Sequence, residues 1–87
     1  MTKLYQNIDE IVKREIGVAE TYEIMYITAL DEKAEMSTAL AYDLLTQSRS
    51  RLGELLEAHT RVKKTTREEA FKTIRAIDSL LEEDKSQ

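Results

Sequence analysis

The sequence predicts an all-α fold, an antiparallel hairpin of two long helices followed by a shorter third helix, as in a three-helix bundle. The 87 residues include no proline and two glycines, and they are rich in Ala, Leu, Glu, Lys and Arg. That composition favours long helices. Apolar residues also recur at alternating spacings of three and four, which places them along one side of a helix. The length predicts a single domain, residues 1–87, whose small core would gain stability from self-association or a partner.

The first helix is expected over about residues 3–30, with Thr2 as its N-cap, because a threonine hydroxyl can accept from an amide of the first turn. Glu15 is the polar residue within its apolar stripe. Gly17 costs about 1 kcal/mol relative to alanine inside a helix, so it marks a kink, a close helix crossing or a position without a structural role. The predicted stripe comprises Leu4, Ile8, Ile11, Val18, Tyr22, Met25 and Ala29.

The second helix is expected over about residues 33–62, after a polar turn around Asp31. The short connection predicts that it packs antiparallel to the first helix. A bend or break is expected between Thr46 and Gly53, because the serines of this stretch compete for backbone hydrogen bonds. The predicted stripe comprises Ala34, Thr38, Ala41, Leu45, Ser48, Leu52, Leu55, His59 and Val62.

The third helix is expected over about residues 67–83, with a polar tail at 84–87 that frays. Thr66 and Glu69 have the spacing of a capping box, in which each side chain accepts from a free backbone amide of the other residue. The predicted stripe comprises Ala70, Ile74, Ile77 and Leu81.

Cysteine is absent, as are an apolar run long enough to cross a membrane and the apolar core of a signal peptide. We therefore expect a cytoplasmic protein. Residues 1–48 have four basic and nine acidic groups, residues 49–75 have eight basic and four acidic groups, and residues 76–87 have one basic and four acidic groups. Such segregation can orient self-association or a partner, or it can reflect charges spread over solvated helix faces.

The apolar arc of the first helix is wider than a hairpin needs, since a helix that packs on one neighbour buries a stripe of about 100°. Between Val18 and Leu30, apolar residues occur on several sides of the helix. Either the third helix covers the additional residues or another chain does, and in the second case they form an association site. The predicted partner-binding residues are Ile16, Ile24, Tyr26, Ile27 and Leu30.

A second candidate surface is basic. Four cations occur in the seven residues from Arg61 to Arg67, and they could contact phosphates. The net charge of −4 argues against nucleic acid as the main partner, and cations near the C-terminus of the second helix also stabilise its dipole. The predicted basic patch comprises Arg49, Arg51, Arg61, Lys63, Lys64 and Arg67.

His59 is the single histidine, and it falls on the apolar stripe of the second helix. Di-iron bundles need a Glu-x-x-His pair from each of two helices, which this sequence lacks. We therefore interpret His59 as a residue at the edge of the core or of an interface.

Two acidic stretches resemble the metal-binding motifs of the MazG-like all-α nucleotide pyrophosphohydrolases. They read Ala19-Glu20-Thr21-Tyr22-Glu23 and Leu40-Ala41-Tyr42-Asp43. The resemblance implies a magnesium site formed by Glu20, Glu23 and Asp43. Ala19 and Leu40 stand where the family has two further acids, and a site with three carboxylates binds magnesium weakly.

The leading prediction is a small adaptor, chaperone-like or inhibitor protein that binds another protein by helix–helix packing, without catalysis, cofactor or metal. Its expected partner is another protein, a second copy in a homo-oligomer, or both. No binding to a membrane is expected. The first alternative is a nucleic-acid-associated regulatory protein that uses residues 61–67. The second alternative is a degenerate magnesium-dependent protein of the pyrophosphohydrolase type.

Overall fold

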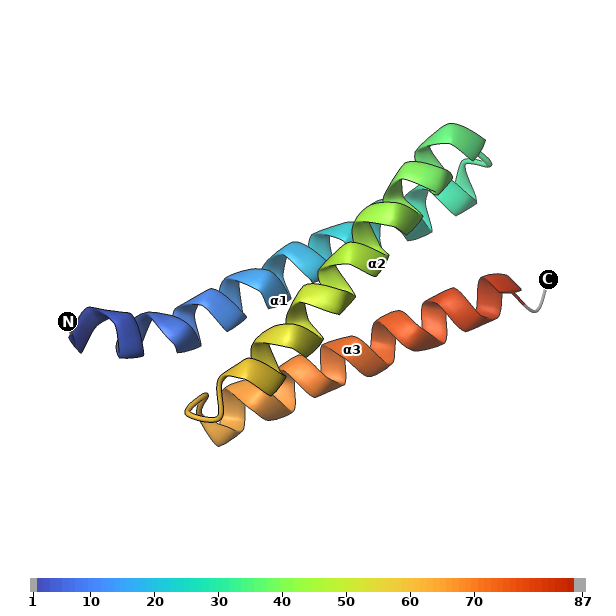
Figure 1. The fold of residues 1–87 in the computed structure, drawn as a ribbon. Coiled ribbons are helices and arrows are strands. Elements are labelled where there is room, and N and C mark those ends of the chain that lie inside the picture. The colour runs from blue at the N-terminus through green and yellow to red at the C-terminus, as the bar shows by residue number, and fades with distance from the viewer. Residues whose placement is uncertain (1, 86–87) are drawn as a thin grey trace.

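Three helices form the part of the chain that the computed structural model describes, residues 2–85, with side chains described for residues 8–82. They are α1 (Thr2–Asp31), α2 (Glu35–Ala58) and α3 (Lys64–Lys85). α1 and α2 run antiparallel as a hairpin, and α3 turns back and packs against both (Figure 1). The predicted all-α, three-helix architecture is confirmed.

The molecule is elongated, with Cα extents of 47 × 21 × 17 Å, and its two ends differ. At the end that we call the base, α2 passes into α3 through residues 59–63. At the end that we call the tip, residues 24–43 form the turn of the hairpin. α3 diverges from the hairpin towards its own C-terminus (Figure 1). The tip is therefore a two-helix structure, whereas all three helices meet nearer the base.

One apolar core runs between the three helices. The contact between α1 and α2 is the most extensive. Towards the tip, the rings of Tyr26 and Tyr42 pack across the hairpin with their centroids 6.2 Å apart, a tilted arrangement that suits aromatic pairs. The buried apolar residues are Val12, Ile16, Ala19, Tyr26, Ala29, Ala41, Leu45, Leu52, Leu56, Val62, Ala70, Ile74 and Ile77.

The buried stripe of α1 is displaced by about one position from the predicted one. Of the predicted members, Ala29 is buried but Ile11 and Met25 are exposed. Because α1 packs against α2 and α3 at once, the centre of its buried arc lies between these neighbours. The side chains of Thr2 and Leu4 lie outside the described residues. The residues at the centre of the arc are Val12, Ile16, Ala19 and Tyr26.

α2 is one continuous helix, so the break that was the stronger form of the prediction for Thr46 to Gly53 does not occur. The Ser48 hydroxyl donates to Glu15 Oε2 of α1 at 2.7 Å, and it therefore does not compete for the backbone of its own helix. Four residues of the predicted stripe are buried within α2, namely Ala41, Leu45, Ser48 and Leu52. The helix ends at Ala58, four residues earlier than predicted.

α3 begins at Lys64, and Thr66 lies within its first turn. The predicted capping box is therefore wrong. The Thr66 hydroxyl donates to Asp9 of α1 and so does not cap its own helix. The backbone of α3 is helical to Lys85, which includes the first two residues of the predicted tail, and residues 86–87 lie outside the described part.

A Schellman motif ends α1 and turns the chain at the tip. The Ala34 amide donates to the Ala29 carbonyl, and the Lys33 amide donates to the Leu30 carbonyl. Lys33 accordingly has φ 57°, the left-handed conformation that this motif needs. Gly17 has no such requirement: no described atom outside its own helix backbone lies within 4 Å of where its Cβ would be, which excludes a close helix crossing there.

Candidate protein-binding surface

Large apolar side chains are exposed on both helices of the tip. Ile24, Ile27 and Leu30 of α1 are 66%, 51% and 39% exposed, and Met36 in the first turn of α2 is 89% exposed. The first three are predicted partner-binding residues. We call these four residues the tip surface. α3 diverges from this end of the hairpin (Figure 1).

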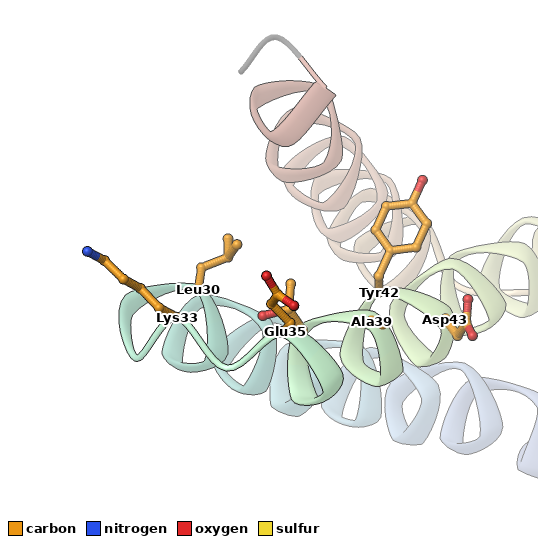
Figure 2. Close-up of a pocket in the computed structure, with 7 residues that line it drawn as sticks. Leu30, Lys33, Glu35, Ala39, Tyr42 and Asp43 are labelled. Atoms are coloured by element: carbon orange, nitrogen blue, oxygen red, sulfur yellow. The ribbon is translucent and has the colours of Figure 1, made fainter.

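An open groove of about 480 Å³ lies beside the tip surface. Figure 2 shows the side chains of Leu30 and Tyr42 projecting from α1 and α2 towards the same side of the hairpin. Three charged side chains line the groove, namely Lys33 of the turn and Glu35 and Asp43 of α2, together with Thr38 and Ala39. The lining of the groove thus combines apolar and charged side chains.

Two of the predicted partner-binding residues are not available to a partner. Ile16 is 3% exposed and Tyr26 is fully buried, and both belong to the core of the single chain. The wide apolar arc of α1 is therefore divided: its part nearest the core is covered within the chain, and Ile24, Ile27 and Leu30 stay outside.

At the base, the carboxylate of Asp9 in α1 accepts hydrogen bonds from the start of α3. Its Oδ1 accepts from the Lys63 amide at 2.9 Å, and its Oδ2 accepts from the Thr66 hydroxyl at 3.0 Å. The bond from the Lys63 amide is the main reason that the pKa of Asp9 is lowered, and the Thr66 bond adds to it. A carboxylate at this position also suits the positive end of the α3 dipole. Sequence reasoning missed Asp9, since it lies 54 residues from the amide that it accepts from.

Three arginines of the predicted basic patch bond within the chain. Arg49 forms a two-pronged ion pair with Asp78 of α3, with N···O distances of 2.8 and 3.0 Å. Hydrogen bonds from this guanidinium lower the pKa of Asp78. Arg51 Nε donates to Glu15 Oε1 of α1 at 3.1 Å. This pair explains how α1 accommodates Glu15 on its packed side.

Arg67 donates to the carbonyl oxygens of Leu56 and His59, at 3.2 and 2.9 Å, and so bonds the C-terminus of α2. The side chains of Arg61, Lys63 and Lys64 are exposed. Three of the six residues of the predicted basic patch, Arg49, Arg51 and Arg67, therefore connect helices, which a count of charges along the sequence does not distinguish from a binding patch.

His59, predicted at the edge of the core or of an interface, is the C-cap residue of α2 and is exposed. Its amide donates to the Leu55 carbonyl, and its own carbonyl accepts from Arg67. The backbone of His59 thus closes the helix, and within the described residues its imidazole belongs to no cluster of metal-ligating side chains.

The three acids of the pyrophosphohydrolase resemblance do not converge. Glu20 and Glu23 face α3 across a groove that Glu69 and Lys72 also line, whereas Asp43 lines the groove at the tip. The described residues contain no group of three or more His, Asp or Glu side chains that could hold a metal ion. The magnesium site implied by the resemblance therefore does not fit this arrangement.

Glu23 is the acid with the least favourable environment. Burial raises its pKa, and the neighbouring charge of Glu20 raises it further. Its Oε1 is buried and has no hydrogen-bond partner among the described residues. Charge at Glu23 is therefore opposed by its position between α1 and α3.

Comparison of the chain with known protein families, with characterised proteins and with solved structures gives no match. None of the helices, over the described residues, is long and apolar enough to cross a membrane. The interpretation of the surface therefore depends on its own geometry and chemistry.

Proposed function

We propose that this chain is a small helical adaptor or inhibitor that binds another protein by helix–helix packing at the tip, without catalysis. The exposure of Ile24, Ile27, Leu30 and Met36 is the observation that carries the proposal. Scattered apolar residues are normal on a protein surface. Four large apolar side chains exposed at one end of a hairpin are a concentration of apolar surface that suits an interaction site. Three of these residues come from consecutive turns of α1, and Met36 lies just past the turn into α2.

The charge of the tip indicates the chemistry of the partner. Residues 24–43 contain four acidic groups and one basic group. A partner helix that presents an apolar stripe with Lys or Arg at its sides would match this surface. Its apolar stripe would contact the exposed apolar side chains, and its cations would lie beside the acidic groups of the tip and orient the contact. Leu30 and Tyr42, which project to one side of the groove, supply its anchoring contacts (Figure 2).

The first test is the effect of a charge at the tip. Ile24→Asp and Ile27→Asp should remove binding to the partner while the helical circular dichroism is kept, because both residues are more than half exposed. The partner is first captured from the host with the wild-type chain and then purified, so that binding is measured by calorimetry between two defined proteins.

Phe71→Asp is the matched control, since Phe71 is an exposed apolar residue of α3, away from the tip. This variant should bind like the wild type. Equal binding by all variants would refute the proposal, and loss of helicity in Ile24→Asp would assign that residue to the core instead. Capture of a nucleic acid in place of a protein would also contradict it.

A further inference from the structure

A second apolar surface lies on the side of the hairpin turned away from α3. On α1, Ile11, Val18 and Met25 follow one another at intervals of seven residues, so they form one line along the helix. Ile11 and Met25 are exposed and Val18 is half-buried. On α2 the corresponding residues are Leu40, which is exposed, and Leu44 and Leu55, which are half-buried. We call these six residues the outer face.

The contacts of α3 place it on the opposite side. Glu20 of α1 lines the groove shared with α3, and Arg49 of α2 is paired with Asp78 of α3. An α-helix turns about 100° per residue. Glu20 and Ile11 are nine residues apart, as are Arg49 and Leu40, so in each helix the outer-face residue lies about 180° from the residue that faces α3. α3 therefore does not cover this face.

An open groove lies at each end of the outer face. The groove at the base, about 640 Å³, includes Ile11, Leu55 and Arg61 in its lining. The groove at the tip, about 320 Å³, includes Met25, Leu40 and Glu32. The same apolar surface thus ends in a basic residue at the base and in an acidic residue at the tip.

The ends of the molecule differ in charge in the same way. Residues 24–43, at the tip, contain four acidic groups and one basic group. Towards the base, residues 8–15 and 49–67 together contain eight basic and five acidic groups. Two copies packed side by side in parallel would bring like ends together. Two antiparallel copies related by a two-fold axis would bring each tip against the base of the other.

The area is sufficient for such a contact. Between Ile8 and Glu32, which line the two grooves, α1 extends roughly 36 Å, and two adjacent helices are roughly 20 Å wide. The footprint is about 700 Å² per copy and about 1,400 Å² in total, which falls in the lower part of the range for specific interfaces. Interfaces of this size span micromolar to picomolar affinities, so the association is measured over a wide range of protein concentration.

We infer that the outer face packs against the same face of a second copy of this chain, in antiparallel orientation. The two hairpins then form a four-helix bundle of two layers, and the α3 of each copy lies on the outside of the dimer. The two-fold axis passes near Val18 and Leu44, midway along the face. Ile24 of the tip surface also lines the groove at the edge of this contact. Ile27 and Leu30 line neither groove of the outer face and remain available to a different protein, so the dimer presents two binding tips at opposite ends.

Light scattering coupled to size-exclusion chromatography, and sedimentation over about 1 μM to 1 mM protein, measure the association. The wild-type chain should form a dimer, and Ile11→Glu should raise its Kd at least tenfold. Phe71→Glu is the matched control, because Phe71 is 43% exposed and Ile11 is 41% exposed, yet Phe71 lies on α3. A monomer throughout the range, or equal effects of the two variants, would overturn the inference. Circular dichroism verifies that each variant is folded.

Orientation is tested by spin labels on single cysteines, which the absence of native cysteine makes specific. Thr21→Cys lies near the middle of the outer face, and Ala58→Cys lies roughly 20 Å along α2 from Leu44. Antiparallel packing predicts an intermolecular distance below about 20 Å at Thr21→Cys and of about 40 Å at Ala58→Cys. Short distances at both positions would show parallel packing and overturn the proposed orientation.

Discussion

The base and the tip of this hairpin are made of the same kinds of residue but use them differently. At the base, charged side chains connect helices: Asp9 bonds the start of α3, Glu15 accepts from Ser48 and Arg51, and Arg67 bonds the end of α2. At the tip, α3 has diverged, and large apolar side chains are left exposed. Stability is thus concentrated where three helices meet, and a surface suited to binding is found where only the hairpin continues.

The largest expected difference between the two regions is in the unfolding free energy of matched leucine variants on α2. Leu52 is fully buried and Leu40 is 58% exposed. Leu52→Ala should cost about 3 kcal/mol, because it removes apolar contacts and leaves a cavity. Leu40→Ala should cost less than about 0.5 kcal/mol at protein concentrations too low for self-association. Urea unfolding followed by circular dichroism at several protein concentrations measures both, and equal losses would contradict this division of the molecule.

A smaller effect is expected from the carboxylate that connects α1 to α3. Asp9→Ala should destabilise the protein by about 2 kcal/mol, of which about 1 kcal/mol is the lost bond to the helix start and the rest the unpartnered Thr66 hydroxyl. Asp9→Asn keeps a side-chain oxygen and should cost about half as much. Urea unfolding at pH 7 measures both variants.

The pH dependence of the unfolding free energy tests whether the charge of Asp9 is the source of this stabilisation. Because its pKa is lowered in the folded state, its stabilisation is complete above the ordinary carboxyl pKa of about 4 and is lost as the pH falls through the lower folded value. Asp9→Asn should lose less stability than the wild type on acidification below about pH 4. Parallel pH profiles for the two proteins would show that other acidic groups cause the loss of stability at low pH.

The smallest effect, and one of opposite sign, is expected at Glu23. Its pKa is raised in the folded state, so protonation favours folding, and the wild type should gain stability from this group as the pH falls towards about 4. Glu23→Gln should therefore stabilise the protein by about 0.5 kcal/mol at pH 7 after allowance for solvent screening. Thermal unfolding at pH 4 and pH 7 measures the difference, and an advantage that persists unchanged at pH 4 would exclude charge burial as its cause.

Local periodicity was sufficient to predict three helices, because each one has apolar residues at helical spacing with few glycines and no proline. The start of α3 shows where such reasoning fails. Thr66 and Glu69 have the spacing of a capping box, but Thr66 donates to Asp9, a residue far away in the sequence. A tertiary hydrogen bond outcompeted the local one, and nothing in the neighbourhood of Thr66 could indicate it.

The candidate site could be predicted only in part, because tertiary packing also decides which apolar residues are covered. Ile24, Ile27 and Leu30 were predicted to lie on a surface outside the hairpin core, and they are exposed; binding by them remains a prediction. Ile16 and Tyr26 were predicted to lie on the same surface and are buried. A helix that is apolar around most of its circumference has no unique buried side, so the position of α3 decides which residues are covered.

The bond between Asp9 and the start of α3 also has a consequence for how the chain acquires its structure. The group that holds the first turn of α3 belongs to α1, and the two are separated by the whole of α2. During synthesis the N-terminal part of a chain is available first, so α1 is already present when α3 emerges from the ribosome. A fragment of α2 and α3 alone lacks this carboxylate, and its third helix would begin without the hydrogen-bond acceptor that the intact chain provides.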